Sequence, residues 1–316
     1  MIFKRIFSMT LAVTVSFMAL AQNDRAGIDK TRNAQTYSDR YDLLVSKLGP
    51  SGVGVETVLD QWEKVDSADA KMLKAKYVYY LNKSRSTRVV TKENPSYLGL
   101  KPILSLKDSL DVTHYYFEEP VYDEELLGKA LKALDRGIRY YPEDLDFRFS
   151  KSAVLMDYEK ESPDMTLQLL ENLVELNEAS SYTWKMADVE NPDKEFVNTA
   201  LQEYCYSFYK IGSAQALEAF RSLSEKVLQY EPKNAVFLGN LGSYYQRQGD
   251  IRKAVKYYNK VLKIDESNYA AIKNMIAIAV AKKDKKTQKK ILPLLIKYGT
   301  ETDKLQAQAR LDVINK

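Results

Sequence analysis

The residue types that most often perform chemistry are scarce in this sequence. His114 and Cys205 are the single histidine and the single cysteine among its 316 residues. A metal site built from histidine or cysteine is therefore excluded, and so is a disulfide framework. His114 lies in an aromatic stretch without a nucleophile beside it, which indicates a packing or surface residue. Cys205 lies among apolar residues at helical spacing and is interpreted as buried core.

Acidic and aromatic side chains are the remaining candidates for chemistry. Acid pairs such as Glu118-Glu119 could do acid–base work, but they are more typical of a solvated loop. The aromatic loop 114–122 could form a binding hot spot if it were exposed. We favour the alternative that it packs on the protein, since large aromatic side chains are mostly buried. No phosphate-binding, hydrolase or metalloprotease motif occurs. We therefore expect no catalytic residue, cofactor or metal, and a protein that is not an enzyme.

The composition indicates an ordered, helical chain. Hydrophobic residues make up 45% and charged residues 28%, which is typical of globular proteins. The chain has only 12 glycines and 9 prolines, too few for the turns of a β-sandwich or barrel, so an all-α fold is favoured. A formal net charge of +4 does not point to nucleic acid. Basic residues are concentrated between Arg252 and Lys297, and acidic residues between Glu143 and Glu195.

Residues 1–21 have the order of a secretory signal peptide. Lys4 and Arg5 precede an apolar run from Ile6 to Leu20, and Ala19-Leu20-Ala21 matches a small-residue cleavage site. The run is shorter than a membrane-spanning helix requires. We therefore expect cleavage before Gln22 and a periplasmic or secreted protein.

A repeat can be identified between Ala235 and Asn268. This segment holds two amphipathic helices joined by a turn at 248–250. Gly242 and Ala254 are small, as required where two helices cross closely. With Leu241, Tyr245, Tyr258 and Val261 they give the segment a close resemblance to the tetratricopeptide repeat (TPR) family.

The resemblance weakens outside this repeat but extends across residues 37–316. It implies an all-α, TPR-like solenoid of about six helix pairs with a C-terminal capping helix. Residues 22–36 are expected to be a linker, followed by helices at about 37–48, 54–65 and 67–83. Residues 84–121 interrupt the pattern with prolines, aromatics and β-branched residues, so we expect an extended or hairpin insertion between the two helices of one repeat.

The resemblance also implies a function, because TPR proteins bind peptides or partner helices in a concave groove lined by the first helix of each pair. We therefore expect a protein–protein interaction scaffold of the bacterial cell envelope with a protein or peptide partner. An envelope enzyme or glycan-handling accessory that uses acidic residues or the aromatic loop 114–122 is the alternative, and a purely structural part of an envelope assembly is a third. The groove-facing candidates are Asn240, Ser243, Gln246, Arg247, Lys273 and Asn274.

The basic C-terminal third allows a second kind of contact. Four lysines follow one face of the second helix of the repeat at spacings of three and four, and six more lie between residues 282 and 290. A solvated outer face is the simpler interpretation. The alternative is attraction to an anionic partner or to a membrane surface. The four lysines are Lys253, Lys256, Lys260 and Lys263.

Overall fold

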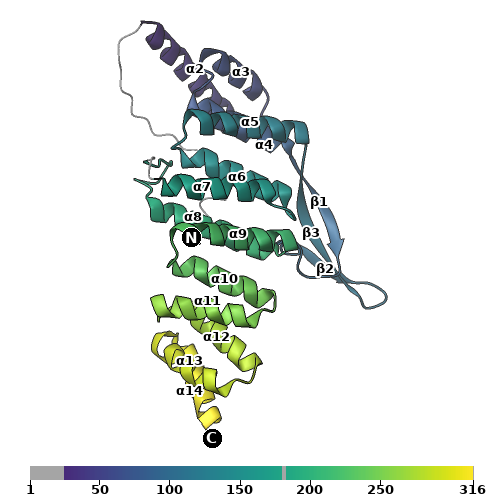
Figure 1. Ribbon diagram of the computed structural model, residues 1–316. Helices are drawn as coiled ribbons and strands as arrows, with labels where there is room; N and C mark the ends of the chain where they lie inside the picture. Colours follow the sequence, from purple (N-terminus) through teal and green to yellow (C-terminus); the bar gives the residue numbers. More distant parts are fainter. Residues whose placement is uncertain (1–24, 180–182, 316) are drawn as a thin grey trace. The chain divides into compact units, whose positions relative to one another are not determined.

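The computed structural model describes residues 25–179 and 183–315, and these are mostly helical (Figure 1). Thirteen helices, α2 to α14, and one three-stranded sheet lie in these ranges. The all-α expectation is therefore confirmed. Residues 1–21, where we expect a signal peptide, lie outside the described residues. Within the described ranges, no helix has the length and apolar character needed to cross a membrane.

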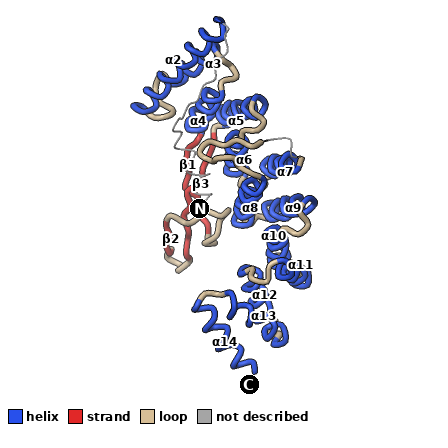
Figure 2. Tube along the Cα trace, turned by 90° about the vertical axis from the view of Figure 1, so that its left-hand side faces the viewer, coloured by secondary structure: helices blue, strands red, loops and turns tan. Residues whose placement is uncertain are grey.

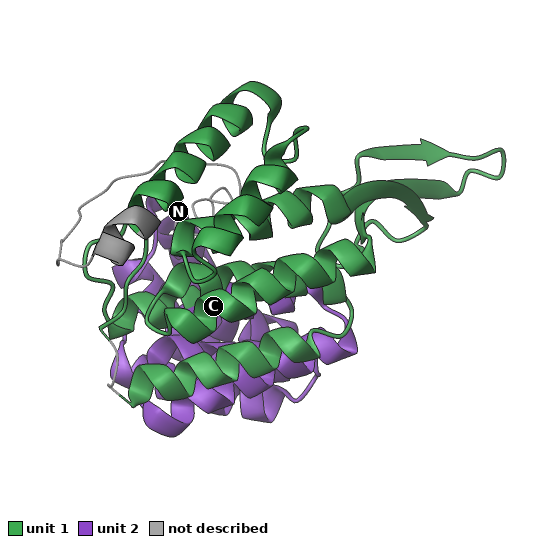
Figure 3. Ribbon diagram, turned by 90° about the horizontal axis from the view of Figure 1, so that it is seen from above, with its two compact units in different colours: residues 1–200 green, residues 201–316 purple. Residues whose placement is uncertain are grey.

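The contacts divide the chain into two compact units, where the sequence indicated one continuous domain. Unit 1 extends to Ala200 and unit 2 runs from Leu201 to Lys316 (Figure 3). The boundary falls within helix α8 (Lys194–Ile211).

Unit 1 is built from packed pairs of helices, α2 with α3, α4 with α5 and α6 with α7. Helix α2 begins at Arg25, so most of the expected linker 22–36 is helical. Helices α3 and α4 lie within three residues of the positions predicted for them. The helices are α2 (Arg25–Leu48), α3 (Val55–Val65), α4 (Ala70–Ser84), α5 (Glu124–Tyr140), α6 (Leu145–Glu159) and α7 (Asp164–Glu178).

Aspartates begin several of these helices. The carboxylates of Asp69, Asp123 and Asp144 each accept a hydrogen bond from a backbone N–H in the first turn of α4, α5 and α6. Such caps satisfy an N–H group that has no partner inside the helix. Buried side chains then join the helices into one core, in which Trp62 of α3 and Phe147 of α6 are almost completely enclosed.

The expected insertion forms a sheet between α4 and α5 (Figure 2). Its strands are β1 (Arg85–Lys92), β2 (Leu104–Lys107) and β3 (Thr113–Tyr122), in the antiparallel order β1-β3-β2. The register pairs Arg85 with Tyr122, so the insertion leaves and returns at the same place. Helices α4 and α5 therefore still pack as a pair. The sheet extends away from the helices of unit 1 (Figure 3).

Unit 2 continues with pairs of helices and ends with a single helix. Helices α10 and α11 pack together, as do α12 and α13, and α14 packs on α13 with Ala307 and Ile314 buried. This is the expected C-terminal capping helix. The helices after α8 are α9 (Ala214–Tyr230), α10 (Ala235–Arg247), α11 (Ile251–Ile264), α12 (Tyr269–Ala281), α13 (Lys285–Tyr298) and α14 (Glu301–Asn315).

The close approach within the α10–α11 pair involves Gly242 and Tyr258. A Cβ atom added to Gly242 would lie 2.5 Å from a carbon of the Tyr258 ring. The sequence analysis placed Ala254 opposite Gly242 at this crossing. Ala254 is completely buried, one helical turn before Tyr258 on α11. Gly242 is therefore small because a buried aromatic ring lies against its backbone.

Candidate functional site

The candidate site is the face that the first helices α10 and α12 present in unit 2. Asn240, predicted to line it, is instead buried, with 8% of its surface exposed. Its side-chain amide exchanges two hydrogen bonds with that of Gln202 on α8, at 2.6 and 3.2 Å. A third bond, of 3.3 Å, runs from Asn240 Nδ2 to the hydroxyl of Ser224 on α9. Asn240 therefore joins neighbouring helices and has no free amide group to offer a ligand.

Ser243 and Gln246 are half-buried beside the same buried tyrosine. The Tyr258 hydroxyl donates to Gln246 Oε1 at 2.9 Å and lies 3.2 Å from Ser243 Oγ. Ser243 also donates to the carbonyl of Gly239. Both side chains still reach the surface. Among the described residues, the amide nitrogen of Gln246 donates no hydrogen bond.

Arg247 is exposed but holds the end of α8. Its Nη1 donates to the Tyr209 carbonyl at 2.8 Å, and its guanidinium lies 4.9 Å from the centre of the Tyr209 ring. A cation is favourable here because the last carbonyls of a helix carry partial negative charge. Part of the guanidinium is thus already used within unit 2.

Lys273 is tied to the capping helix. Its Nζ lies 2.6 Å from the carboxylate of Asp303, which also accepts hydrogen bonds from Tyr269 and Thr300. The hydrogen bond from Lys273, followed by those from Thr300 and Tyr269, holds the pKa of Asp303 well below its usual range. Lys273 is therefore part of the contact between α12 and α14. Its neighbour Asn274 is half-buried.

Apolar residues complete this face, and the sequence analysis did not select them. Tyr206 on α8 and Val236 on α10 are 53% and 47% exposed. Ala270 and Ala277 on α12 are also exposed, and a Cβ at Gly239 would meet no atom within 4 Å. Val236 and Ala270 are one repeat length apart, so they hold equivalent positions in successive repeats. We call this surface the first-helix face of unit 2. It consists of Tyr206, Val236, Gly239, Ser243, Gln246, Arg247, Ala270, Lys273, Asn274 and Ala277.

Residues 114–122 belong to strand β3. Its last residues pack on α6, as favoured from the sequence, with Tyr122 against Tyr158. Tyr115 and Tyr116 instead pair within the sheet. Phe117 is completely buried against Tyr97. Glu119 is buried among Arg88, Tyr97 and Lys160, at 2.7, 2.9 and 3.1 Å. Burial alone would raise the pKa of this carboxyl, but the hydrogen bonds from these partners lower it. Glu119 is therefore an ionised structural residue.

The two scarce residue types occupy the kinds of position expected for them. Cys205 is completely buried, and burial raises the pKa of its thiol to about 12, which leaves it in the unreactive protonated form. His114 Nε2, near the start of β3, lies 2.9 Å from the carboxylate of Asp108, which directly follows β2. Within residues 25–179 and 183–315, no three histidine, cysteine or acidic side chains are grouped to hold a metal ion.

Comparison with known families supports the repeat that the residue pattern indicated. The family model described as "Tetratricopeptide repeat" matches residues 235–268, which form helices α10 and α11. Residues 235–268 are a tetratricopeptide repeat. No curated protein matches the sequence significantly.

The solved structures to which this chain is similar include the following three. One is described as "YrrB: a TPR protein with an unusual peptide-binding site", with 17% identity over 79% of this chain and 97% of that one, at a TM-score of 0.36. The "MamA RS-1 ArsTM double mutant" has 15% identity over 76% and 97%, at 0.32. "MamA 41-end from Desulfovibrio magneticus RS-1" has 16% identity over 76% and 98%, at 0.30.

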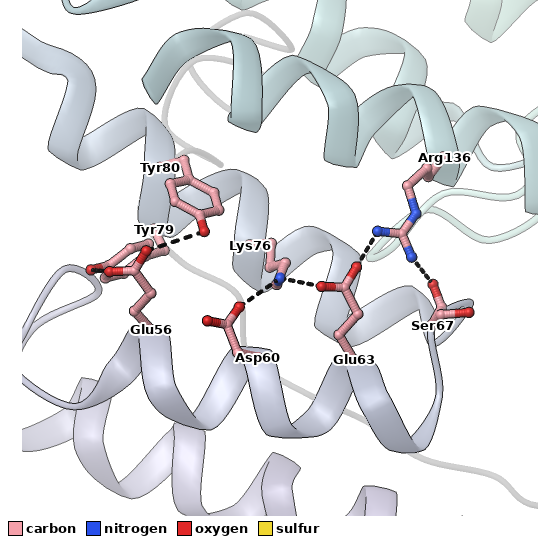
Figure 4. Close-up of polar contacts among 8 residues, drawn as sticks. All are labelled: Glu56, Asp60, Glu63, Ser67, Lys76, Tyr79, Tyr80 and Arg136. Carbon is pink, nitrogen blue, oxygen red and sulfur yellow. Dashed lines mark hydrogen bonds and ion pairs between the residues drawn. The ribbon is translucent and has the colours of Figure 1, made fainter. Parts of the chain in front are cut away.

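A second polar cluster lies far from the tetratricopeptide repeat in sequence, in unit 1 (Figure 4). Lys76 of α4 is buried and forms ion pairs with Asp60, at 2.9 Å, and with Glu63. Arg136 of α5 also pairs with Glu63 and donates to the carbonyl of Ser67. The cluster thus links α3, α4 and α5 through paired charges.

The same row of acids on α3 also binds two tyrosines. Glu56 accepts hydrogen bonds from Tyr79 and Tyr80, at 2.8 and 3.3 Å. Burial, together with this carboxylate, raises the pKa of both phenols to about 12. The signal for this cluster was present in the sequence, because Glu56, Asp60 and Glu63 follow one helix face at spacings of four and three.

The paired state of Glu63 predicts an acid-sensitive contribution to stability. Burial would raise its pKa, but the hydrogen bonds from Arg136 and Lys76 lower it overall. A lowered pKa stabilises the folded state above the unfolded pKa of about 4.3, and this contribution is lost as the pH falls through the folded value. We expect wild type to be more stable than Glu63→Gln at pH 7 and this difference to shrink below about pH 4. Urea unfolding followed by circular dichroism measures it; a difference independent of pH would contradict the pairing.

Proposed function

We propose that the protein is an interaction scaffold that binds a segment of a partner protein on the first-helix face of unit 2. The signal-peptide pattern of residues 1–21 adds the proposal that it works in the periplasm or outside the cell. The observation that carries the binding proposal is the pair of exposed apolar side chains, Tyr206 and Val236, on the first helices at and next to a tetratricopeptide repeat.

Small residues on this face suit the approach of another backbone. Gly239, Ala270 and Ala277 leave the helices without long side chains between the apolar positions. Buried apolar contacts at the centre of an interface supply much of its affinity. Half-buried polar groups of Ser243, Gln246 and Asn274 can then pair with the polar groups of the bound segment, which limits the cost of removing those groups from water.

The charged residues have a secondary role in this proposal. Arg247 and Lys273 are predicted site residues, but each also stabilises unit 2 through Tyr209 or Asp303. Reversing the charge of Lys273 would place two carboxylates together and disturb the packing of α14. Substitutions at these positions would therefore mix effects on binding with effects on stability.

Val236 and Ala277 allow a sharper test. Val236→Glu places a carboxylate in the first turn of α10, where negative charge is favourable. Ala277→Glu substitutes one good helix former for another. The matched control introduces glutamate at Leu305 and Val313, which are 73% and 69% exposed on α14.

We expect the face pair V236E/A277E to lose the partner and the control pair L305E/V313E to retain it. The measurement is an affinity pull-down of cell-envelope proteins with wild type and both pairs, quantified by mass spectrometry after their melting curves have been matched. Equal capture of the same proteins by all three forms would show that binding does not use the first-helix face.

A further inference from the structure

A recess in unit 2 lies away from the first-helix face. It has a volume of about 290 Å³ and is open to solvent between α11, α12 and the start of α13. On α12 the lining residues Ile278 and Ala279 lie three and four residues after Met275, on a different side of the helix from Lys273 and Ala277. The lining residues are Ile251, Arg252, Val255, Met275, Ile278, Ala279, Lys282, Asp284 and Thr287. We call this recess the α11–α13 groove.

The floor of the groove is apolar. Met275, Ile278 and Ala279 of α12 are buried, and Ile251 and Val255 of α11 are half-buried beside them. Helices α11 and α12 belong to successive repeats, so the groove is a gap between two repeats rather than a defect within one pair. An apolar side chain that filled it would remove this surface from water, which is favourable.

The rim of the groove is basic. Arg252 and Lys282 are exposed. Lys283, Lys285 and Lys286 follow directly in the chain and are also exposed. Asp250 interacts with the charge of Arg252, but its ion pair is with Lys253.

Asp284, the single acid of the lining, offsets only part of this positive charge. The Asp284 carboxylate accepts hydrogen bonds from Thr287 N and Thr287 Oγ1, at 3.0 and 2.6 Å, and thereby caps α13. The groove therefore combines an apolar floor with an excess of positive charge.

We infer that the α11–α13 groove binds an acidic protein segment, which inserts one bulky apolar side chain while its carboxylates meet Arg252 and Lys282. The inference rests on the proposed binding function and adds a second site with its own ligand chemistry. The volume lies at the lower limit for small-molecule pockets, roughly 300 Å³, which suits one or two side chains better than a free metabolite. Charge-assisted hydrogen bonds from Arg252 and Lys282 would fix the flanking carboxylates.

A membrane surface is the competing occupant for this basic zone. Lysines alone would attract anionic lipids regardless of the recess between them. The groove, in contrast, has room for one apolar side chain of a bound segment. Binding to the groove should therefore require an apolar residue in the ligand as well as negative charge. That dependence separates the two occupants experimentally.

The probe is a fluorescein-labelled peptide in which one leucine lies between three aspartates on each side. Its binding to the full protein is measured by fluorescence anisotropy, beside a peptide with serine in place of the leucine. We expect the leucine peptide to bind more tightly and to weaken as salt rises. R252E/K282E should lower its affinity by roughly tenfold or more, because both charge-assisted contacts are lost.

Two variants make the result specific to the groove. K256E/K260E changes the net charge equally on an exposed part of α11 outside the lining, and should change affinity much less. Val255→Phe fills the recess while keeping the rim charges, and should remove the preference for leucine over serine. Melting curves establish that each variant is folded.

Three results would overturn the inference: equal affinities for the leucine and serine peptides, equal losses in the two charge-reversed pairs, or binding to phosphatidylglycerol vesicles but not to either peptide. The pull-down with V236E/A277E remains independent of these. If the peptides fail while that pair still loses its partner, the groove inference falls and the proposed function stands.

Discussion

Replacing Tyr258 with alanine should lower the free energy of unfolding by about 3–5 kcal/mol, the usual cost of truncating a buried aromatic side chain. Tyr258 is 1% exposed and its ring fills the space left by Gly242 between α10 and α11. Its removal would leave a cavity inside the tetratricopeptide repeat, where Ala254 and Gly242 are too small to fill it. Urea unfolding followed by far-UV circular dichroism measures the loss.

Tyr258→Phe is the matched control because it keeps the ring and removes only the hydroxyl. Gln246 and Ser243, which lie within hydrogen-bond distance of that hydroxyl, are half-buried, and water can replace part of the lost bonding. The cost should therefore be about 1 kcal/mol. Equal losses in both variants would mean that the hydroxyl, and not the ring, stabilises this pair.

The sequence predicted the helix pairs because their determinants are local. A tetratricopeptide repeat places small and large residues at fixed spacings within a single helix pair, so Gly242 and Tyr258 can be recognised without a structure. The insertion at 84–121 was recognised for the same reason, because prolines and β-branched residues oppose a helix wherever they occur. Its antiparallel pairing, in contrast, joins residues from opposite ends of the insertion, such as Arg85 and Tyr122.

The parts of the candidate site that were missed depend on distant partners. Asn240 occupies a position predicted to face a ligand, but Gln202, on an earlier helix, supplies the matching amide that allows its burial. Lys273 was predicted to face the concave groove, but Asp303 on the capping helix pairs with it. Helical periodicity identifies the face of a helix and not what covers that face. At residues 25–36 the sequence analysis missed a helix and predicted a linker. These residues include few apolar side chains, so the helix has no hydrophobic periodicity that could reveal it.

Helix α12 contributes to both proposed binding surfaces, and this constrains how each can be tested. Ala270 and Ala277 belong to the first-helix face, and Ile278 and Ala279 belong to the α11–α13 groove. Substitutions in its buried residues would disturb both surfaces at once. Variants restricted to exposed side chains are therefore needed, and the chosen pairs meet this condition.

In unit 1, replacing Trp62 with alanine should also cost about 3–5 kcal/mol of unfolding free energy. Trp62 is 1% exposed on α3 and packs against Tyr41 of α2, with ring centroids 6.3 Å apart. Its indole Nε1 donates to Asp69 at 3.3 Å, and Asp69 in turn caps α4 by accepting from the Met72 N–H. The side chain therefore supports α2, α3 and the start of α4 together.

Trp62→Phe distinguishes packing from the hydrogen bond to Asp69. It retains most of the apolar contact and removes the indole donor, so its cost should be well below that of alanine. Far-UV circular dichroism follows unfolding in urea, and the second tryptophan, Trp184, remains as a fluorescent reporter within unit 1. If Trp62→Phe cost as much as Trp62→Ala, the cap at Asp69 would be the dominant contribution and the packing of α2 on α3 a minor one. An unchanged midpoint in Trp62→Ala would contradict the placement of Trp62 in the core of unit 1.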